Sequence, residues 1–295
     1  MMYKILFIIF AAVALNAGNK KQLLNFSRPA YPGDEFSCSI SASSCIITTT
    51  EFAETNTAPA ISELKKTVQA KGRIRVIKVN KKGISTIIEF TPESFQGSIN
   101  SKKIIPSWIG KTLKINLNSN PICTFKIINQ KTQISTVEIQ LLDLIFKPAP
   151  EYSLADLINP QTPIAEVDSW QPDLNPFLKI FKNQGIETNE ILPLSGKVKL
   201  IGKKTFQNYQ CWNIQEKVTM KNIPGIKFDF FLSTLIPIKK NLGPSLHTVR
   251  KIYEKIEKLP TSNSFMTSGI KKISLEMTEA INITSIPILP TKNHK

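Results

Sequence analysis

The side chains in this sequence that could carry out nucleophilic chemistry are few and isolated. A catalytic cysteine needs a general base beside it, and histidine is the usual base. The chain contains two histidines, of which His294 is the penultimate residue and His247 lies in a predicted helix. Cys211 lies in a predicted strand, and nothing in the spacing brings it to His247. We therefore expect Cys211 to belong to the scaffold.

Other catalytic motifs are incomplete. Ser62 and Lys65 have the Ser-x-x-Lys spacing, but the Ser-Asp-Asn and Lys-Thr-Gly motifs of penicillin-binding enzymes do not occur. The Gly-Lys-Thr of residues 110–112 lacks the first glycine of a phosphate loop, because Ile105 stands at that position. The sequence also lacks the metal-binding patterns Cys-x-x-Cys and His-Glu-x-x-His. We expect no enzymatic activity, no cofactor and no metal, and a hydrolase with scattered carboxylates is the least favoured alternative.

Residues 1–18 have the pattern of a secretory signal peptide. Lys4 precedes an apolar run over residues 5–10, and small residues that include Ala12 and Ala14 follow. The run is shorter than the ~20 apolar residues of a spanning helix, and no later stretch is long and apolar enough to span. We expect an exported protein, periplasmic or secreted after signal-peptide cleavage, and not a transmembrane protein.

Export would favour disulfides among the four cysteines. Cys38 and Cys45 are close in sequence, so their pairing is the first expectation, which leaves Cys123 to pair with Cys211. Four cysteines permit three connectivities. The alternative is that the cysteines are buried free thiols.

The formal net charge of +16 raises the question of an anionic partner. Few of the basic residues are arginines, and the lysines are spread almost evenly along the chain. Base readout and bidentate phosphate contacts favour arginine, so we expect no nucleic-acid partner. The charge either reflects a composition rich in lysine, isoleucine and asparagine, or attracts the protein to anionic material of the cell envelope.

Hydrophobic periodicity predicts both helices and strands. Apolar residues at a helical period predict helices over residues 57–72, 175–185 and 246–259. Alternation of apolar and polar residues predicts strands, over residues 72–79, 84–90, 111–118, 123–128, 135–146, 196–201, 209–220, 226–236 and 271–284. We therefore predict an α+β fold, a mostly antiparallel sheet with a few covering helices, for which an open half-barrel is one form.

Prolines divide the predicted elements into two β-rich halves. They recur between residues 148 and 176, where they would interrupt a sheet ladder because proline cannot donate its backbone hydrogen bond. The expected organisation is a signal peptide (1–18), an irregular N-terminal segment (19–57), a first β-rich half (58–147), a Pro-rich connection (148–176), a second β-rich half with a covering helix (177–290) and a basic tail (291–295).

The second half resembles a group of exported bacterial proteins of unknown function. In that group an Asp-Ser-Trp stretch precedes a strand with spaced glycines, and a strand with the pattern Tyr-x-Cys-Trp-x-Ile follows. The matching residues here are Asp168, Ser169 and Trp170, the strand from Gly196, and Tyr209, Cys211, Trp212 and Ile214. More distantly, the pattern is similar to the open half-barrels of periplasmic lipoprotein carriers, in which a curved antiparallel sheet and covering helices enclose an apolar cavity. This resemblance implies a fold more than an activity.

Two classes of function compete with the hydrolase. The first is a non-enzymatic envelope or secreted protein that binds an apolar ligand or lipid in a curved sheet, and the second is a structural or interaction module with a filled core and no ligand. For the first class, alternation along residues 226–236 predicts that one set of side chains lines the cavity, opposite two residues of the covering helix 246–259. The predicted lining residues are Ile226, Phe228, Phe230, Leu232, Val249 and Tyr253.

Overall fold

The computed structural model describes residues 26, 29–52, 57–118, 123–130, 132–148, 154–160, 162–164, 168–175, 177–178, 194–223, 226–239, 245–258 and 270–288. Within these ranges, the side chains of residues 154, 221–223, 226, 253, 255–258, 270 and 271 are not described. The expected signal peptide over residues 1–18 and the basic tail over residues 291–295 lie outside the described residues.

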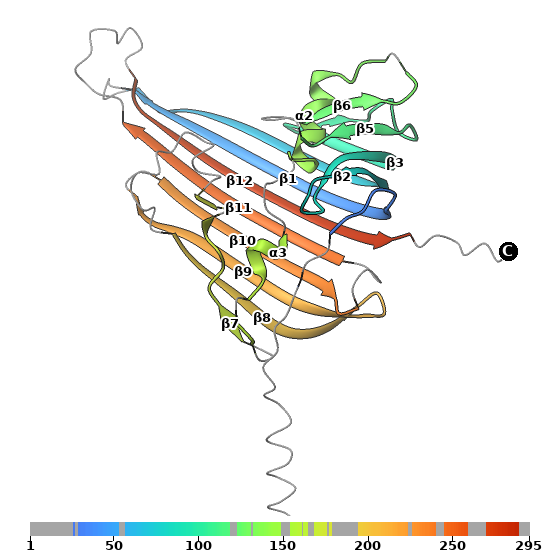
Figure 1. Cartoon of the computed structure of the whole chain (residues 1–295). Coiled ribbons are helices and arrows are strands. Elements are labelled where there is room, and N and C mark those ends of the chain that lie inside the picture. Colours follow the sequence, from blue (N-terminus) through green and yellow to red (C-terminus); the bar gives the residue numbers. More distant parts are fainter. Residues whose placement is uncertain are drawn as a thin grey trace, which may run out of the picture.

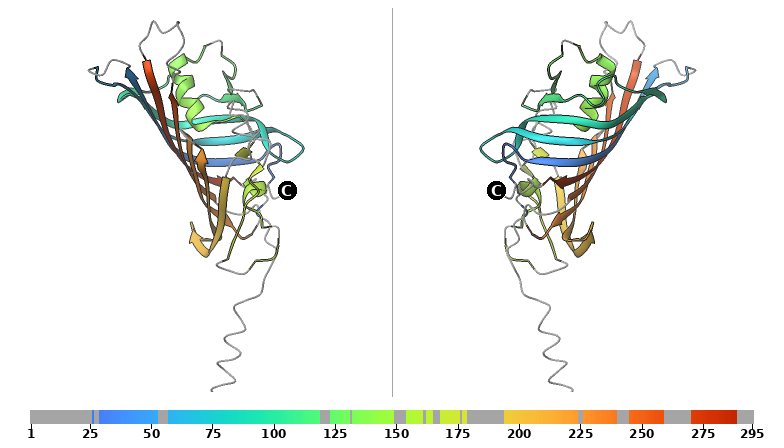
Figure 2. Two further views of the ribbon diagram at one scale, coloured as in Figure 1. Left: turned by 90° about the vertical axis from the view of Figure 1, so that its left-hand side faces the viewer. Right: turned by 90° about the vertical axis from the view of Figure 1, so that its right-hand side faces the viewer.

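A single antiparallel sheet of 12 strands makes up most of the structure (Figure 1). The strands are β1 (Glu35–Phe52), β2 (Ala60–Val79), β3 (Ser85–Ile99), β4 (Lys102–Ile104), β5 (Leu113–Asn116), β6 (Thr124–Ile127), β7 (Ser169–Trp170), β8 (Leu194–Phe206), β9 (Tyr209–Ile223), β10 (Ile226–Pro237), β11 (Ser245–Lys258) and β12 (Ile270–Pro287). Their spatial order is β6-β5-β3-β2-β1-β12-β11-β10-β9-β8-β7, and β4 pairs with β3 beside this path. The sheet is strongly twisted, so the blue and cyan strands run at a steep angle to the orange ones (Figure 2).

The path of the chain makes the first and last strands neighbours. β1 lies near the middle of the sheet and pairs with both β2 and β12. From β1 the chain runs outward to the edge at β6, crosses to the opposite edge at β7, and returns through β8, β9, β10 and β11 to β12. Both edge strands are short, and β7 pairs with only Val198 and Lys199 of β8.

Side chains alternate between the two faces of the sheet. In β1, Ile40 and Ala42 are buried, whereas Ser39 and Ser41 are exposed. Directly paired residues share a face, so the register extends this assignment from strand to strand. We call the face that carries Ile40 and Ala42 the inner face, and the opposite one the outer face.

The segment that crosses from β6 to β7 covers the inner face. It contains the helices α2 (Thr136–Ile145) and α3 (Leu154–Ile158), and Figure 2 shows it on one side of the sheet. α2 begins with a capping box, in which the Glu138 backbone N–H donates to Ser135 Oγ and the Ser135 backbone N–H donates to the Glu138 carboxylate. Leu141 of α2 lies directly over Gly97 of β3.

Two apolar clusters lie between the sheet and this cover. Cluster 1 lies under α2 and packs it against β1, β2, β3 and β5; among its largest buried side chains are Phe90, Phe95, Trp108, Leu113, Ile115, Leu141 and Leu142. Cluster 2 lies on β8, β9 and β10 under α3, Ile164 and Phe177. Its members are Phe26, Ile158, Ile164, Phe177, Val198, Leu200, Trp212, Ile214, Val218, Met220, Phe228, Phe230, Leu232 and Ile236. The sheet therefore presents one continuous inner face to two separate apolar cores.

The predicted α+β fold is wrong, because one antiparallel sheet dominates and the helices α2 and α3 are short. Of the predicted helix 175–185, the described residues 175, 177 and 178 are helical. Most of the two long predicted helices, residues 57–72 and 246–259, lies in β2 and β11. Each of these segments pairs with a strand on both sides. The two hydrogen-bonded ladders therefore outweigh a local helical period.

Two further expectations about local structure are wrong. Residues 135–146, predicted as a strand, contain α2, whose capping box is the local signal that outweighs the alternation. The N-terminal segment 19–57, predicted as irregular, contains the 18-residue strand β1. Ser39, Ser41 and Ser43 of β1 face outward and alternate with apolar or small residues of the inner face.

Candidate functional site

The inner face of β8, β9 and β10 carries the predicted ligand-lining residues. Phe228, Phe230 and Leu232 are buried on this face, as the alternation predicted, and Val249 packs against them. Val249 lies on the neighbouring strand β11 and not on a covering helix, so this part of the expectation is wrong. The backbones of Ile226 and Tyr253 belong to β10 and β11, but their side chains lie outside the described residues.

The crossing segment provides aromatic contacts to this surface. The ring of Phe177 lies edge-to-face on Phe230, with 5.0 Å between centroids, and 6.4 Å from Phe228. The indole N–H of Trp170 donates to the Ile158 carbonyl at 3.1 Å and ties β7 to α3. Two ring contacts of Phe177 and the indole hydrogen bond of Trp170 thus help to hold the cover of cluster 2 on the sheet.

Glu216 is the exceptional residue of this face. It lies in β9 directly between Val198 of β8 and Leu232 of β10. Its side chain is fully buried, and neither carboxyl oxygen has a hydrogen-bond partner among the described residues. The register continues this row across the sheet through Val249, Ile281, Ala42, Val68 and Gly97. Glu216 is therefore the only ionisable side chain in an otherwise apolar row that spans eight strands.

Burial raises the pKa of the Glu216 carboxyl to about 8. The cause is desolvation, because an ionised carboxylate among aliphatic side chains loses its hydration without gaining a charge partner. The group is thus mainly protonated at neutral pH, and it can then donate one hydrogen bond and accept others. Sequence reasoning missed this residue. The alternation in the sequence contains a signal for it. Glu216 occupies an inward position of one predicted strand, between the apolar residues Trp212, Ile214, Val218 and Met220.

A row of polar residues lies one step along the inner face, between the two apolar clusters. Lys251 of β11 is directly opposite Glu279 of β12, which is opposite Ser44 of β1. Lys147, just after α2, forms an ion pair with Glu279 at 3.3 Å. Desolvation lowers the pKa of Lys251, while Glu279 acts in the opposite direction. Glu279 thus lies between two lysines, and the row separates the clusters and joins the end of α2 to β12.

The cysteines do not form the expected disulfides. All four are free thiols. Cys38 and Cys45 lie on the same strand at odd spacing, so Cys38 is buried on the inner face and Cys45 lies on the outer face. Seven residues of extended strand separate their Cα atoms by ~20 Å, whereas a disulfide requires less than ~7 Å. Cys123 donates to the Phe146 carbonyl in cluster 1, far from Cys211 in β9 at the other end of the sheet.

The structure does not assemble a cysteine–histidine pair either. Thr234 Oγ1 of β10 lies 2.7 Å from His247 Nδ1, and this pair faces inward. Cys211 is paired with Pro237, at a position that alternates to the opposite face. The expectation that Cys211 is not activated by His247 agrees with this geometry.

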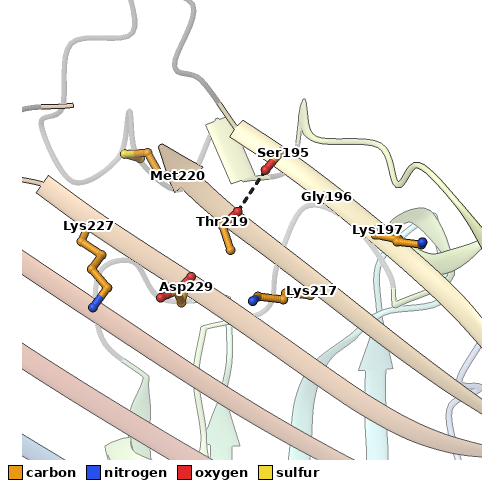
Figure 3. A pocket seen from close by; sticks show the side chains of 8 residues that line it. All are labelled: Ser195, Gly196, Lys197, Lys217, Thr219, Met220, Lys227 and Asp229. Carbon is orange, nitrogen blue, oxygen red and sulfur yellow. Dashed lines mark hydrogen bonds between the residues drawn. The ribbon is translucent and has the colours of Figure 1, made fainter. Parts of the chain in front are cut away.

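A second feature lies on the outer face of the same three strands. A hollow of about 500 Å³ is lined by Ser195, Gly196, Lys197, Lys217, Thr219, Met220, Lys227 and Asp229 (Figure 3). Lys197 and Lys217 lie directly opposite each other on β8 and β9. Ser195 Oγ and Thr219 Oγ1 are hydrogen bonded at 3.0 Å, as the dashed line in Figure 3 marks. Lys227 forms an ion pair with Glu254 at 2.8 Å.

Comparisons with known proteins assign neither a family nor a function. No family model matches the chain, and no curated protein matches it. Two crystal structures of Pseudomonas aeruginosa proteins align with a TM-score of 0.16 and 6% identity. They are OccK11 (OpdR), with 90% of this chain and 100% of that chain covered, and OpdQ, with 86% and 98% covered. A TM-score this low carries no argument about fold or function. Neither helix in the described part of the chain is long and apolar enough to cross a membrane.

Proposed function

We propose that the protein is a non-enzymatic binding protein that takes an apolar ligand with one hydrogen-bonding group on the inner face of β8, β9 and β10. The observation that carries this proposal is Glu216, which is fully buried and has no partner for either carboxyl oxygen among the described residues. Burial of an unsatisfied polar group costs free energy. A core selected only for stability would carry an apolar residue at this position.

The chemistry of the surroundings defines the ligand. Glu216 is flanked by Val198 and Leu232 across the strands and by Ile214 and Val218 along its own strand. These side chains favour an acyl chain or a similar apolar group. A protonated carboxyl at their centre favours an ester, hydroxyl or carboxylic acid group, which can accept or donate one hydrogen bond. The Phe177 side chain would leave Phe230 when such a ligand enters.

The test compares two substitutions at the same position. Native mass spectrometry would detect ligand that copurifies with the protein, and titration with a fluorescent fatty acid would measure affinity. Glu216→Gln keeps a donor and an acceptor, whereas Glu216→Leu removes both at similar volume. We expect binding to survive in Glu216→Gln and to weaken roughly tenfold in Glu216→Leu, the worth of one charge-free buried hydrogen bond. Glu93→Gln, an exposed acid on β3, is the control.

The outcomes separate the proposal from its alternative. Equal binding by wild type and Glu216→Leu would remove Glu216 from the site. Absence of saturable binding by a folded wild-type protein would reject the ligand altogether.

The second candidate function is a structural or interaction module with a filled core. The edge-to-face contact between Phe177 and Phe230 favours it, because the cover then completes the core with the protein's own side chains. Under this alternative, wild type binds no fatty acid, and Glu216→Leu changes only the stability.

A further inference from the structure

The outer hollow contains a pair of directly opposed lysines, an arrangement that Lys114 and Lys126 of β5 and β6 also show. Lys197 and Lys217 are directly opposite each other on adjacent strands, and both are exposed. Like charges at directly opposed positions destabilise a sheet. Within the described part of the chain, neither lysine forms an ion pair that would offset this repulsion.

Hydroxyl groups lie beside this pair of lysines. Ser195 and Thr219 are the next outward-facing pair along the same two strands, and their hydroxyl oxygens are 3.0 Å apart. Only one of the two hydroxyl groups donates in this hydrogen bond, so the other retains an O–H group for a further acceptor. Lys197, Lys217 and one free O–H thus border the same hollow, where the two lysine side chains extend in opposite directions from their strands (Figure 3).

We propose that this hollow binds a single phosphate-bearing group, held by Lys197 and Lys217 and by the hydroxyls of Ser195 and Thr219. Lysine binds phosphate as a point charge and donates up to three hydrogen bonds. Bound phosphate would remove the repulsion between the two lysines. The carboxylate of Asp229 borders the hollow on the β10 side and repels a second anion there, which favours one anionic group over a long polyanion.

Two kinds of molecule carry such a phosphate group. One is a free phosphorylated solute, and the other is an anionic phospholipid with the phosphate in its headgroup. The experiment uses the full chain at low ionic strength, because screening weakens exposed charges. One arm titrates inorganic phosphate by calorimetry, and the other measures cosedimentation with vesicles of phosphatidylglycerol or of neutral phosphatidylcholine.

The variants separate a site from the general positive charge. Lys197→Gln/Lys217→Gln removes the pair in the hollow. Lys71→Gln/Lys103→Gln removes the same charge from exposed lysines of β2 and β4. We expect the first double variant to lose affinity at least about fivefold, as two surface charge contacts would give, and the second to lose less than about twofold. Circular dichroism checks that both fold, and Lys197→Gln alone replaces the double variant if that variant does not.

Each outcome decides the proposal. A selective loss in the inorganic phosphate arm supports the site and identifies free phosphorylated solutes as its source. A selective loss with phosphatidylglycerol vesicles alone supports the site and identifies a lipid headgroup. Equal losses of affinity in the two double variants would show that binding depends only on the overall positive charge, and would overturn the proposal. Wild-type protein that binds neither probe would also overturn it. None of these results depends on fatty-acid binding at the inner face.

Discussion

At the scale of single residues, Glu216 links stability, pH and function. The folded-state pKa of about 8 lies above the ordinary value of 4.5. Between these two pH values the folded protein holds a proton that the unfolded chain has released. The free energy of unfolding therefore decreases as the pH rises from 4.5 to 8, and this contribution is constant above that range.

Glu216→Leu is expected to remove this pH dependence and to stabilise the protein at high pH. The gain at pH 9 is expected to be on the order of 3 kcal/mol, since one pKa unit corresponds to ~1.4 kcal/mol and local relaxation reduces the full shift. Urea unfolding of wild type and variant at pH 5, 7 and 9 measures it. A variant with the wild-type slope over this range would show that Glu216 is hydrated in the folded protein. Glu93→Gln, which removes an exposed carboxylate, is expected to leave the slope unchanged.

The thiols give a second prediction at this scale. Burial raises the pKa of Cys38 and of Cys123 to about 11, and only the thiolate reacts rapidly with a disulfide reagent. Desolvation and the Glu63 carboxylate also raise the pKa of Cys45, but its half-buried side chain on the outer face is the most accessible of the four thiols. A thiol titration of native protein is expected to show one fast phase, absent in Cys45→Ser, and unreduced denatured protein is expected to titrate four thiols. A titration that finds only two thiols after denaturation would reveal a disulfide.

At the scale of elements, the contact between α2 and β3 depends on a missing side chain. Gly97 is buried under Leu141, and a Cβ at residue 97 would overlap the end of the leucine side chain. The glycine therefore allows α2 to approach the sheet closely. This contact positions α2, which covers cluster 1.

Gly97→Ala is expected to destabilise the protein by ~1–3 kcal/mol through overpacking. Leu141→Ala alone is expected to cost ~2–5 kcal/mol through the cavity that it leaves. The double variant should cost less than the sum, because the added methyl group enters that cavity. Urea unfolding of the three variants tests this coupling, with exposed Gln96→Ala as the control. Strict additivity would mean that the two residues do not touch in solution.

At the scale of the whole molecule, the pairing of β1 with β12 joins the two β-rich halves into one sheet. The pairing extends from Phe36–Pro287 to Phe52–Ile270. If the halves were separated, both strands would become long, unpaired edges. Each half also holds its apolar cluster on a sheet that continues into the other half.

Fragments 19–147 and 148–295 are therefore not expected to fold alone. Each should lack a cooperative unfolding transition and should aggregate through its exposed edge, whereas coexpressed fragments should associate. Circular dichroism during urea titration and size-exclusion chromatography of the separate and coexpressed fragments measure this. Independent cooperative transitions of the two fragments would establish two domains.

Much of the strand content could be predicted from the sequence. Alternation in residues 209–220 and 226–236 identified β9 and β10, because a half-buried strand imposes a period of two on the side chains. The same alternation placed Phe228, Phe230 and Leu232 on one face, and the structure confirms their burial. Composition and motif spacing also predicted that Cys211 belongs to the scaffold, and this stays a prediction.

Only the tertiary structure decided the rest. Residues 57–72 and 246–259 have apolar side chains at a helical period, but partners on both sides make them strands β2 and β11. The inward placement of Glu216 and the opposition of Lys197 to Lys217 depend on register between strands. Register is a non-local property, set by which strands pair and where. The sequence pattern thus determined which residues form strands and which faces they share, while strand pairing determined which side chains meet.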